Sequence, residues 1–138
     1  MKYLLDTDIC IFFLQGKFSI KDKIKEVDVR NCCISELTIA ELKYGVEKSE
    51  NYEKHEKEVK KVENLFVIIP IYKSFDKYAK EKVKLQKAGN LIPDFDLLIG
   101  ASSITEGLIM VSNNEKHLSR LKGIQLENWT KPAFNKHL

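Results

Sequence analysis

The sequence predicts an α/β fold in which a central, mainly parallel sheet of four to five strands lies between two layers of helices. Short apolar runs of strand length alternate with longer stretches of helical periodicity, and this alternation is typical of a parallel sheet with crossover helices. With 138 residues, 43% hydrophobic and 31% charged, the chain has the size and composition of one globular domain. We therefore expect residues 1–138 to form a single three-layer α/β/α domain.

The first half of the chain predicts two strands and the helices that follow them. The first strand is a short apolar run that ends at Asp6, after which Thr7 offers a capping hydroxyl and Gly16 a left-handed helix end. The second run contains two cysteines, and Ser35 or Thr38 can cap the helix after it. We expect strands at residues 2–6 and 31–35, and helices at residues 8–14, 19–27, 39–48 and 51–64.

The second half continues the alternation. Its first run is β-branched and ends at Pro70, so we expect a strand that is buried on both faces. An apolar helix then begins near Asp94, directly after Pro93, and Trp129 is expected to pack near the terminus. We expect strands at residues 65–70 and 108–112, an edge strand at 124–126, helices at 74–88 and 94–106, and a short helix that carries His117 and Leu118.

Composition argues against several classes of protein. No apolar run approaches the ~20 residues that span a bilayer, and the first residues lack the apolar core of a secretory signal, so we expect a cytoplasmic protein without membrane contact. Cys10, Cys32 and Cys33 lack the spacing of a zinc site and are expected to be reduced core thiols. The formal charge is +3, with 21 lysines against two arginines. This balance suits contact with nucleic-acid phosphates, although the lysines also fit a purely solvating role on helix faces.

Acidic and polar side chains are predicted to gather at one edge of the sheet. Asp6 ends the first strand, and a polar turn from Ser112 to Asn114 ends the fourth. The carboxyl ends of parallel strands form the usual ligand site of an open α/β sheet. Asp96, in the first turn of its helix, can join this edge.

Several of the acids also fit local structural roles. Asp6 alone is compatible with a simple turn former. Glu41 lies three residues after Thr38, which is the spacing of a capping box, and Asp94 suits a helix cap better than Asp96 does. The sequence leaves these alternatives open, and the hypothesis of a metal site rests on the joint placement of the acids.

Converging carboxylates predict a divalent cation, because their mutual repulsion raises their pKa values unless a cation neutralises them. Oxygen ligands favour Mg²⁺ or Mn²⁺ over zinc, and phosphodiester hydrolysis is a natural reaction for such a site. The histidines form no triad: His55 is expected to pack inside, His117 to be a surface neighbour of the last strand turn, and His137 to lie in the tail. Neither a nucleophile elbow nor a glycine-rich phosphate loop is present.

Four motifs occur in order along nearly the whole chain. They are residues 4–9 around Asp6, residues 35–45 around Glu41, residues 95–101 around Asp96, and residues 111–114 followed by 127–129. Together they resemble the PIN-domain toxins of the VapC type. The resemblance implies a PIN-like α/β/α fold and a metal-dependent ribonuclease, the toxin of a type II toxin–antitoxin pair, which forms a homodimer and is held inactive by a VapB-like antitoxin.

The resemblance also implies roles for single residues. Asp6, Glu41 and Asp96 match the three family acids and are expected to bind Mg²⁺ or Mn²⁺ as catalytic residues. Asn114 stands where many PIN domains carry a fourth aspartate, so it is expected to orient water or phosphate. The remaining matches are the hydroxyls of Thr7 and Ser112, expected to orient the substrate, and the extra acids Asp8 and Asp94, expected to support the metal ligands or to cap a helix.

The predicted reaction is hydrolysis of RNA, with lysines around the rim holding its backbone. A receiver-like signalling domain is a rival, but it needs an aspartate closing a middle strand and a lysine closing a late one. Here the third strand ends Ile69-Pro70 and the fourth Ser112-Asn113. A catalytically silent PIN-like module that binds RNA or protein is the second alternative, and the missing fourth acid favours it.

Overall fold

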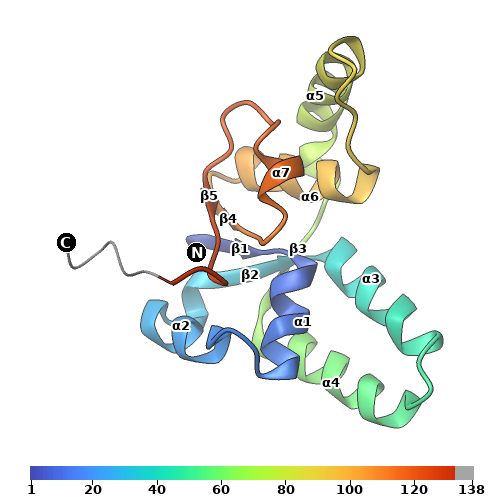
Figure 1. The fold of residues 1–138 in the computed structure, drawn as a ribbon, viewed down its shortest axis with the longest axis vertical. Helices are drawn as coiled ribbons and strands as arrows, with labels where there is room; N and C mark the ends of the chain where they lie inside the picture. The colour runs from blue at the N-terminus through green and yellow to red at the C-terminus, as the bar shows by residue number, and fades with distance from the viewer. Residues whose placement is uncertain (133–138) are drawn as a thin grey trace.

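The computed structural model of the chain describes residues 1–132 (Figure 1). Five parallel strands form one sheet in the order β3-β2-β1-β4-β5, which confirms the predicted parallel sheet. The chain starts at the centre of the sheet and adds strands on one side before it crosses to the other. The strands are β1 (Tyr3–Leu5), β2 (Cys32–Ser35), β3 (Val67–Ile69), β4 (Ile109–Val111) and β5 (Leu126–Glu127).

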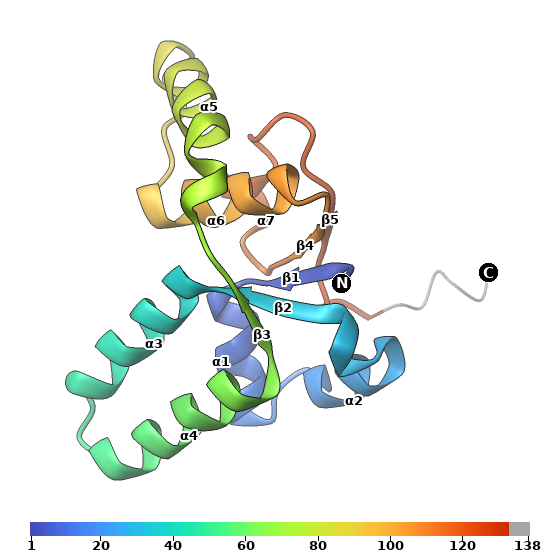
Figure 2. The same ribbon diagram turned by 180° about the vertical axis from the view of Figure 1, so that it is seen from behind.

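Helices cover both faces of the sheet, as predicted for a three-layer fold. Helices α1 to α4 lie on one side of the strands and α5 to α7 on the other (Figures 1 and 2). Within residues 1–132, no helix combines the length and the apolar character needed to cross a bilayer. The helices are α1 (Thr7–Gln15), α2 (Ile20–Val27), α3 (Glu36–Glu47), α4 (Tyr52–Leu65), α5 (Phe75–Lys87), α6 (Asp94–Thr105) and α7 (Glu115–Leu118), with 3₁₀ turns η1 (Val29–Asn31) and η2 (Tyr72–Ser74).

Side chains of the central strands alternate between two apolar cores. Leu5 and Val111 contribute to the core under α1 to α4, whereas their neighbours Leu4 and Met110 contribute to the core under α5 to α7. This alternation follows from the two-residue period of a strand, and it makes β1 and β4 apolar on both faces. The three cysteines are buried and free, as predicted, and burial raises the pKa of the Cys32 thiol to about 11.

Two predictions about the elements next to β2 are wrong. Helix α3 begins earlier than predicted, at Glu36, because the Ser35 hydroxyl accepts a hydrogen bond of 3.1 Å from the backbone N–H of Leu37. Strand β3 is not buried on both faces: Val67 is 51% and Ile68 39% exposed. The reason is position, since β3 lies at the edge of the sheet with β2 as its one neighbouring strand.

The last strand and the tryptophan lie close to where the sequence predicts them. Strand β5 pairs with β4 at the sheet edge, although it covers Leu126–Glu127 instead of residues 124–126. Trp129 is 8% exposed and packs edge-on against the ring of Tyr3, with the ring centroids 5.3 Å apart. The C-terminal end of the described chain is thereby attached to the central strand.

Candidate active site

The carboxyl ends of β1 and β4 bring Asp6 and Ser112 together. These parallel strands are neighbours in register, with Leu5 opposite Val111, so the residues that follow them meet at one edge of the sheet. The Ser112 hydroxyl donates a 2.7 Å hydrogen bond to Oδ2 of Asp6, across 106 residues of sequence. The prediction that these two residues share the sheet edge is confirmed.

Asp6 is a buried acid in an environment that disfavours its charge. It is 5% exposed and caps α1, where its Oδ1 accepts a 2.9 Å hydrogen bond from the backbone N–H of Thr7. Burial, together with the negative charges of Asp8 and Asp96, raises the pKa of Asp6 to about 7, against the lowering effect of the hydrogen bonds. Near neutral pH the carboxyl group is therefore poised between its neutral and charged forms.

Asp8 lies in the first turn of α1 and belongs to the same cluster. Its Oδ2 accepts a 3.0 Å hydrogen bond from the backbone N–H of Asn113, while its Oδ1 is buried without a hydrogen-bond partner. Burial raises the pKa of Asp8, and the charge of Asp96 adds to the effect. A buried carboxylate oxygen without a hydrogen-bond partner destabilises the folded state, unless another group or an ion binds it.

Asp96, in the first turn of α6, is joined to Asp6 through a chain of hydrogen bonds. The side-chain amide of Asn114 donates to Oδ2 of Asp96 at 3.1 Å, and the backbone N–H of Asn114 donates to the Ser112 hydroxyl at 2.9 Å. Ser112 in turn donates to Asp6. Asn114 and Ser112 thus fix the relative positions of the two predicted catalytic aspartates.

Glu41 approaches this cluster from α3 and is held by a hydroxyl of α1. The Thr7 hydroxyl donates a 2.6 Å hydrogen bond to Oε1 of Glu41 and lies 3.0 Å from the hydroxyl of Thr38. The capping-box alternative for Glu41 is wrong, because α3 begins at Glu36 and its cap is Ser35. The residue lies too far along the helix to reach the unpaired N–H groups at its start.

Asp94 does not cap α6, so that part of its prediction is wrong, while its support of the metal ligands stays a prediction. The cap position is Pro93, and no side-chain capping bond is formed. Asp94 is exposed and faces α5, where its Oδ1 lies 2.9 Å from both Lys82 Nζ and the Tyr78 hydroxyl. It therefore belongs to the contact between α5 and α6, two residues from Asp96 but with different partners.

His117 is the residue that sequence reasoning missed. It was expected only as a surface neighbour of the strand turn, but its Nδ1 lies 3.4 Å from Oδ2 of Asp96 and 3.3 Å from Nδ2 of Asn114. The available signal was its spacing, since a residue three positions after Asn114 shares its helix face. His55 is partly exposed and contacts Ser49 and Glu58, away from the acids; His137 lies outside the described residues.

The donor chemistry of the cluster fits a divalent cation. The charges of Asp8 and Asp96 raise the pKa of Asp6, the charge of Asp96 raises that of Asp8, and one buried oxygen of Asp8 is unpartnered, so a bound cation would relieve these costs. Carboxylate oxygens are ligands that suit Mg²⁺ and Mn²⁺. As they stand, no three His, Cys, Asp or Glu side chains of residues 1–132 converge on one ion position. The assignment of Asp6, Glu41 and Asp96 as direct ligands therefore stays a prediction.

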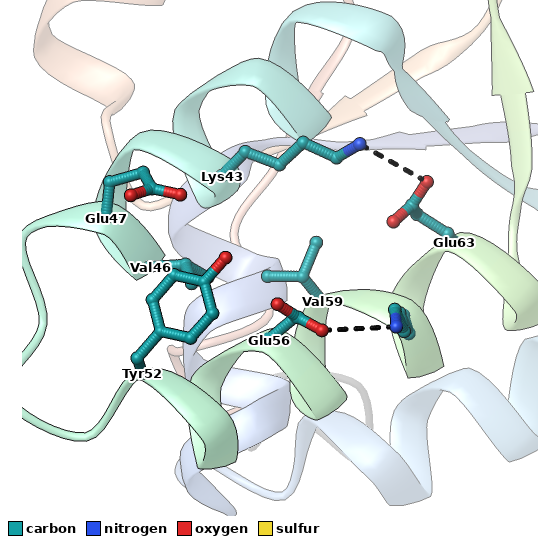
Figure 3. A pocket seen from close by; sticks show the side chains of 8 residues that line it. Lys43, Val46, Glu47, Tyr52, Glu56, Val59 and Glu63 are labelled. Atoms are coloured by element: carbon teal, nitrogen blue, oxygen red, sulfur yellow. Dashed lines mark ion pairs between the residues drawn. The ribbon is translucent and has the colours of Figure 1, made fainter.

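A separate pocket lies between α3 and α4, and none of the predicted site residues lines it. Its volume is about 310 Å³, and an ion pair joins Lys43 of α3 to Glu63 of α4 (Figure 3), while Lys60 pairs with Glu56 along α4. Because none of the aspartates lines it, this pocket is no part of the candidate active site.

The chain is similar to known proteins in both sequence and structure. Residues 3–124 match the PIN domain family. The chain is 34% identical to Ribonuclease VapC2 of Haemophilus influenzae, over 94% of this chain and 98% of that protein. It is 30% identical to tRNA(fMet)-specific endonuclease VapC of Shigella flexneri, over 94% and 99%. The crystal structure of VapBC2 from Rickettsia felis, bound to a DNA fragment from their promoter, contains a chain with a TM-score of 0.86 and 32% identity, covering 94% of this chain and 99% of that one.

Proposed function

Since the chain belongs to the PIN-domain family, as a ribonuclease toxin of the VapC type, we propose that it hydrolyses RNA phosphodiester bonds with the help of Mg²⁺ or Mn²⁺. The observation that carries this proposal is the hydrogen-bonded chain from Asp6 through Ser112 and Asn114 to Asp96. It holds two carboxylates that lie far apart in the sequence at one sheet edge, with a third, Asp8, close enough to raise the pKa of Asp6.

In this proposal Asp6, Glu41 and Asp96 hold the cation. When bound, such a cation lowers the pKa of a coordinated water and polarises a phosphate oxygen. Ser112 fixes the orientation of Asp6 through the 2.7 Å hydrogen bond to its Oδ2. Thr7 does the same for Glu41, and Asn114 for Asp96. Exposed lysines contribute the attraction for the RNA backbone.

The first test of the proposal is charge removal at the two linked aspartates. Asp6→Asn and Asp96→Asn keep the size of the side chains but remove the negative charge, so we expect RNA cleavage to fall at least 100-fold while the circular dichroism spectrum is unchanged. Asp94→Asn is the matched control: it removes the same charge from the same helix turn as Asp96, outside the hydrogen-bonded chain. Wild-type cleavage rates in folded Asp6→Asn and Asp96→Asn proteins would refute the assignment.

The second test removes the cation. Excess chelator is expected to abolish cleavage of RNA, and added Mn²⁺ or Mg²⁺ to restore it. Cleavage that persists unchanged in chelator would mean that no divalent cation takes part. The relative from Shigella flexneri is named for tRNA(fMet), which makes this tRNA the first substrate to try.

The partner is proposed from the same relatives. Related solved structures include VapBC complexes from Rickettsia felis and Salmonella typhimurium, so we propose a VapB-like antitoxin as the partner that inhibits this chain. A homodimer and a cytoplasmic location remain predictions. Family membership favours the enzyme over the catalytically silent module, and RNA binding without cleavage in Mn²⁺ would reverse that preference.

A further inference from the structure

Three polar side-chain atoms form a small triangle on the outer side of the site. Oδ2 of Asp96 lies 3.1 Å from Nδ2 of Asn114 and 3.4 Å from Nδ1 of His117, and the third side, between Asn114 and His117, is 3.3 Å. Asp96 comes from α6, whereas His117 lies in α7 and Asn114 is the residue that caps the start of α7. The triangle therefore depends on how α7 packs against α6.

These spacings are long for hydrogen bonds of the imidazole. N–H···O bonds cluster near ~2.9–3.0 Å, and charge-assisted bonds to a carboxylate are shorter still. Ligand atoms at ~2.1 Å from one ion and at right angles to one another lie ~3.0 Å apart. The Nδ2 atom of Asn114 is a hydrogen-bond donor to Asp96 and not a ligand atom, so the pair of ligand atoms is Oδ2 of Asp96 and Nδ1 of His117. Their separation of 3.4 Å suits two neighbouring ligands of one ion better than it suits a tight ion pair.

The backbone around His117 is anchored by packing, and its imidazole is open to an incoming ion. Leu118, next to His117, is fully buried, and Leu121 packs against the surface of α6 at Gly100. The side chains of His117 and Asp96 are 35% and 24% exposed, so solvent reaches the gap between them.

We propose that His117 is a nitrogen ligand of the cation that Asp96 binds, and that it makes the site prefer Mn²⁺ to Mg²⁺. Imidazole is a good ligand for first-row transition ions, whereas Mg²⁺ favours oxygen ligands. The inference rests on the proposed function, because it concerns the same cation. It adds a residue and an ion preference that the carboxylates alone do not provide.

The test measures binding of Mn²⁺ alone, without RNA, to metal-free protein. Pulsed EPR of bound Mn²⁺ is expected to show coupling to an imidazole nitrogen in the wild type and none in His117→Ala. Calorimetric titration is expected to show a loss of Mn²⁺ affinity of about tenfold or more in that variant, with little change for Mg²⁺. His55→Ala is the matched control, since His55 contacts Ser49 and Glu58 elsewhere, and it should keep both the coupling and the affinity.

A glutamine at this position separates ligation from simple support of Asp96. His117→Gln keeps a hydrogen-bond donor near Asp96 but removes the imidazole, so it is expected to lose the nitrogen coupling and the Mn²⁺ preference. Wild-type Mn²⁺ affinity in His117→Gln, or no nitrogen coupling in the wild type, overturns the proposal. Loss of cleavage in Asp6→Asn and Asp96→Asn tests the proposed function separately, because the nitrogen coupling does not depend on RNA hydrolysis.

Discussion

Burial of the Asp6 carboxyl group both lowers the stability of the folded state and favours the binding of a cation. Its carboxyl group is almost inaccessible, and its two hydrogen bonds lower its pKa less than burial and the neighbouring charges raise it. In the absence of a cation, ionisation of Asp6 therefore acts against the fold. A divalent cation removes this penalty, so the repulsion among the carboxylates favours binding of a cation.

The raised pKa of Asp6 predicts that metal-free protein loses stability as the pH rises. Between pH ~4, where an unfolded aspartate ionises, and about 7, the folded state holds a proton that the unfolded state has released. The free energy of unfolding should thus be higher near pH 5 than near pH 8, by a few kcal/mol at most. Denaturant titrations in chelator at these pH values measure the difference.

Two variants check the source of this pH dependence. Asp6→Asn should flatten the decline, since the amide does not ionise. Asp94→Asn should leave it unchanged, because the hydrogen bonds of Asp94 with Lys82 and Tyr78 lower its pKa and place its titration below this range. A wild-type stability that is flat or rises from pH 5 to pH 8 would contradict the account.

The residues that sequence reasoning placed correctly follow directly from strand ends. Asp6 and Ser112 could be predicted because an apolar run shows where a parallel strand stops. The partners of Glu41 and Asp94 could not, because the first depends on how α1 packs against α3 and the second on a contact between α5 and α6. The spacing of His117 from Asn114 was a local signal, but the contact of His117 with Asp96 also depends on how α7 packs against α6.

At the level of elements, the close contact between α6 and α7 determines the outer half of the site. Gly100 lies one turn after Asp96, on the same face of α6, and its missing side chain lets α7 and the following loop approach. A Cβ atom at this position would lie 2.5 Å from Leu121 Cδ1 and 3.1 Å from Leu118 Cδ2. The buried Glu81 secures the same loop from α5, where its Oε1 accepts the backbone N–H of Lys122 at 2.9 Å.

We expect Gly100→Ala to damage both stability and metal binding. The leucine side chains must shift to admit the methyl group, at a cost of about 1–3 kcal/mol, and α7 should move away from Asp96. Gly45→Ala is the matched control, because Gly45 is also helical but has open space around its Cβ position; there alanine should stabilise the helix by about 0.5–1 kcal/mol. Urea titration and Mn²⁺ calorimetry measure the two effects, and equal behaviour of the two variants would contradict the packing argument.

Burial at the level of strands was harder to predict than their existence. The apolar runs correctly predicted β1, β2, β3 and β4, because a short apolar run between turn residues is typical of a strand in a protein of this composition. The order of the strands is a property of the whole sheet, and it leaves β3 at an edge with Val67 and Ile68 exposed. Similar apolar runs thus have different surroundings according to topology alone.

For the molecule as a whole, we predict that a divalent cation stabilises the folded state. A cation that binds only the folded protein, at a hundredfold excess over its Kd, adds about 3 kcal/mol, or roughly 5–10 °C in Tm. Thermal unfolding at pH 8 with Mn²⁺ should show this shift in the wild type, and Asp6→Asn and Asp96→Asn should show little of it. Sodium chloride at the same ionic strength is the control. An equal shift in Tm with that salt would mean that the stabilisation comes from screening of charges and not from a bound cation.

The position of β1 at the centre of the sheet also governs when the protein becomes active during its synthesis. Asp6 emerges from the ribosome early, but its partner Ser112 follows 106 residues later, together with the strand that completes this part of the sheet. At ~5–20 residues per second, the two are made about 5–20 s apart. The nascent chain therefore carries its first acid long before it has an assembled site, and fragments from interrupted translation that lack β4 should be harmless to the cell that makes them.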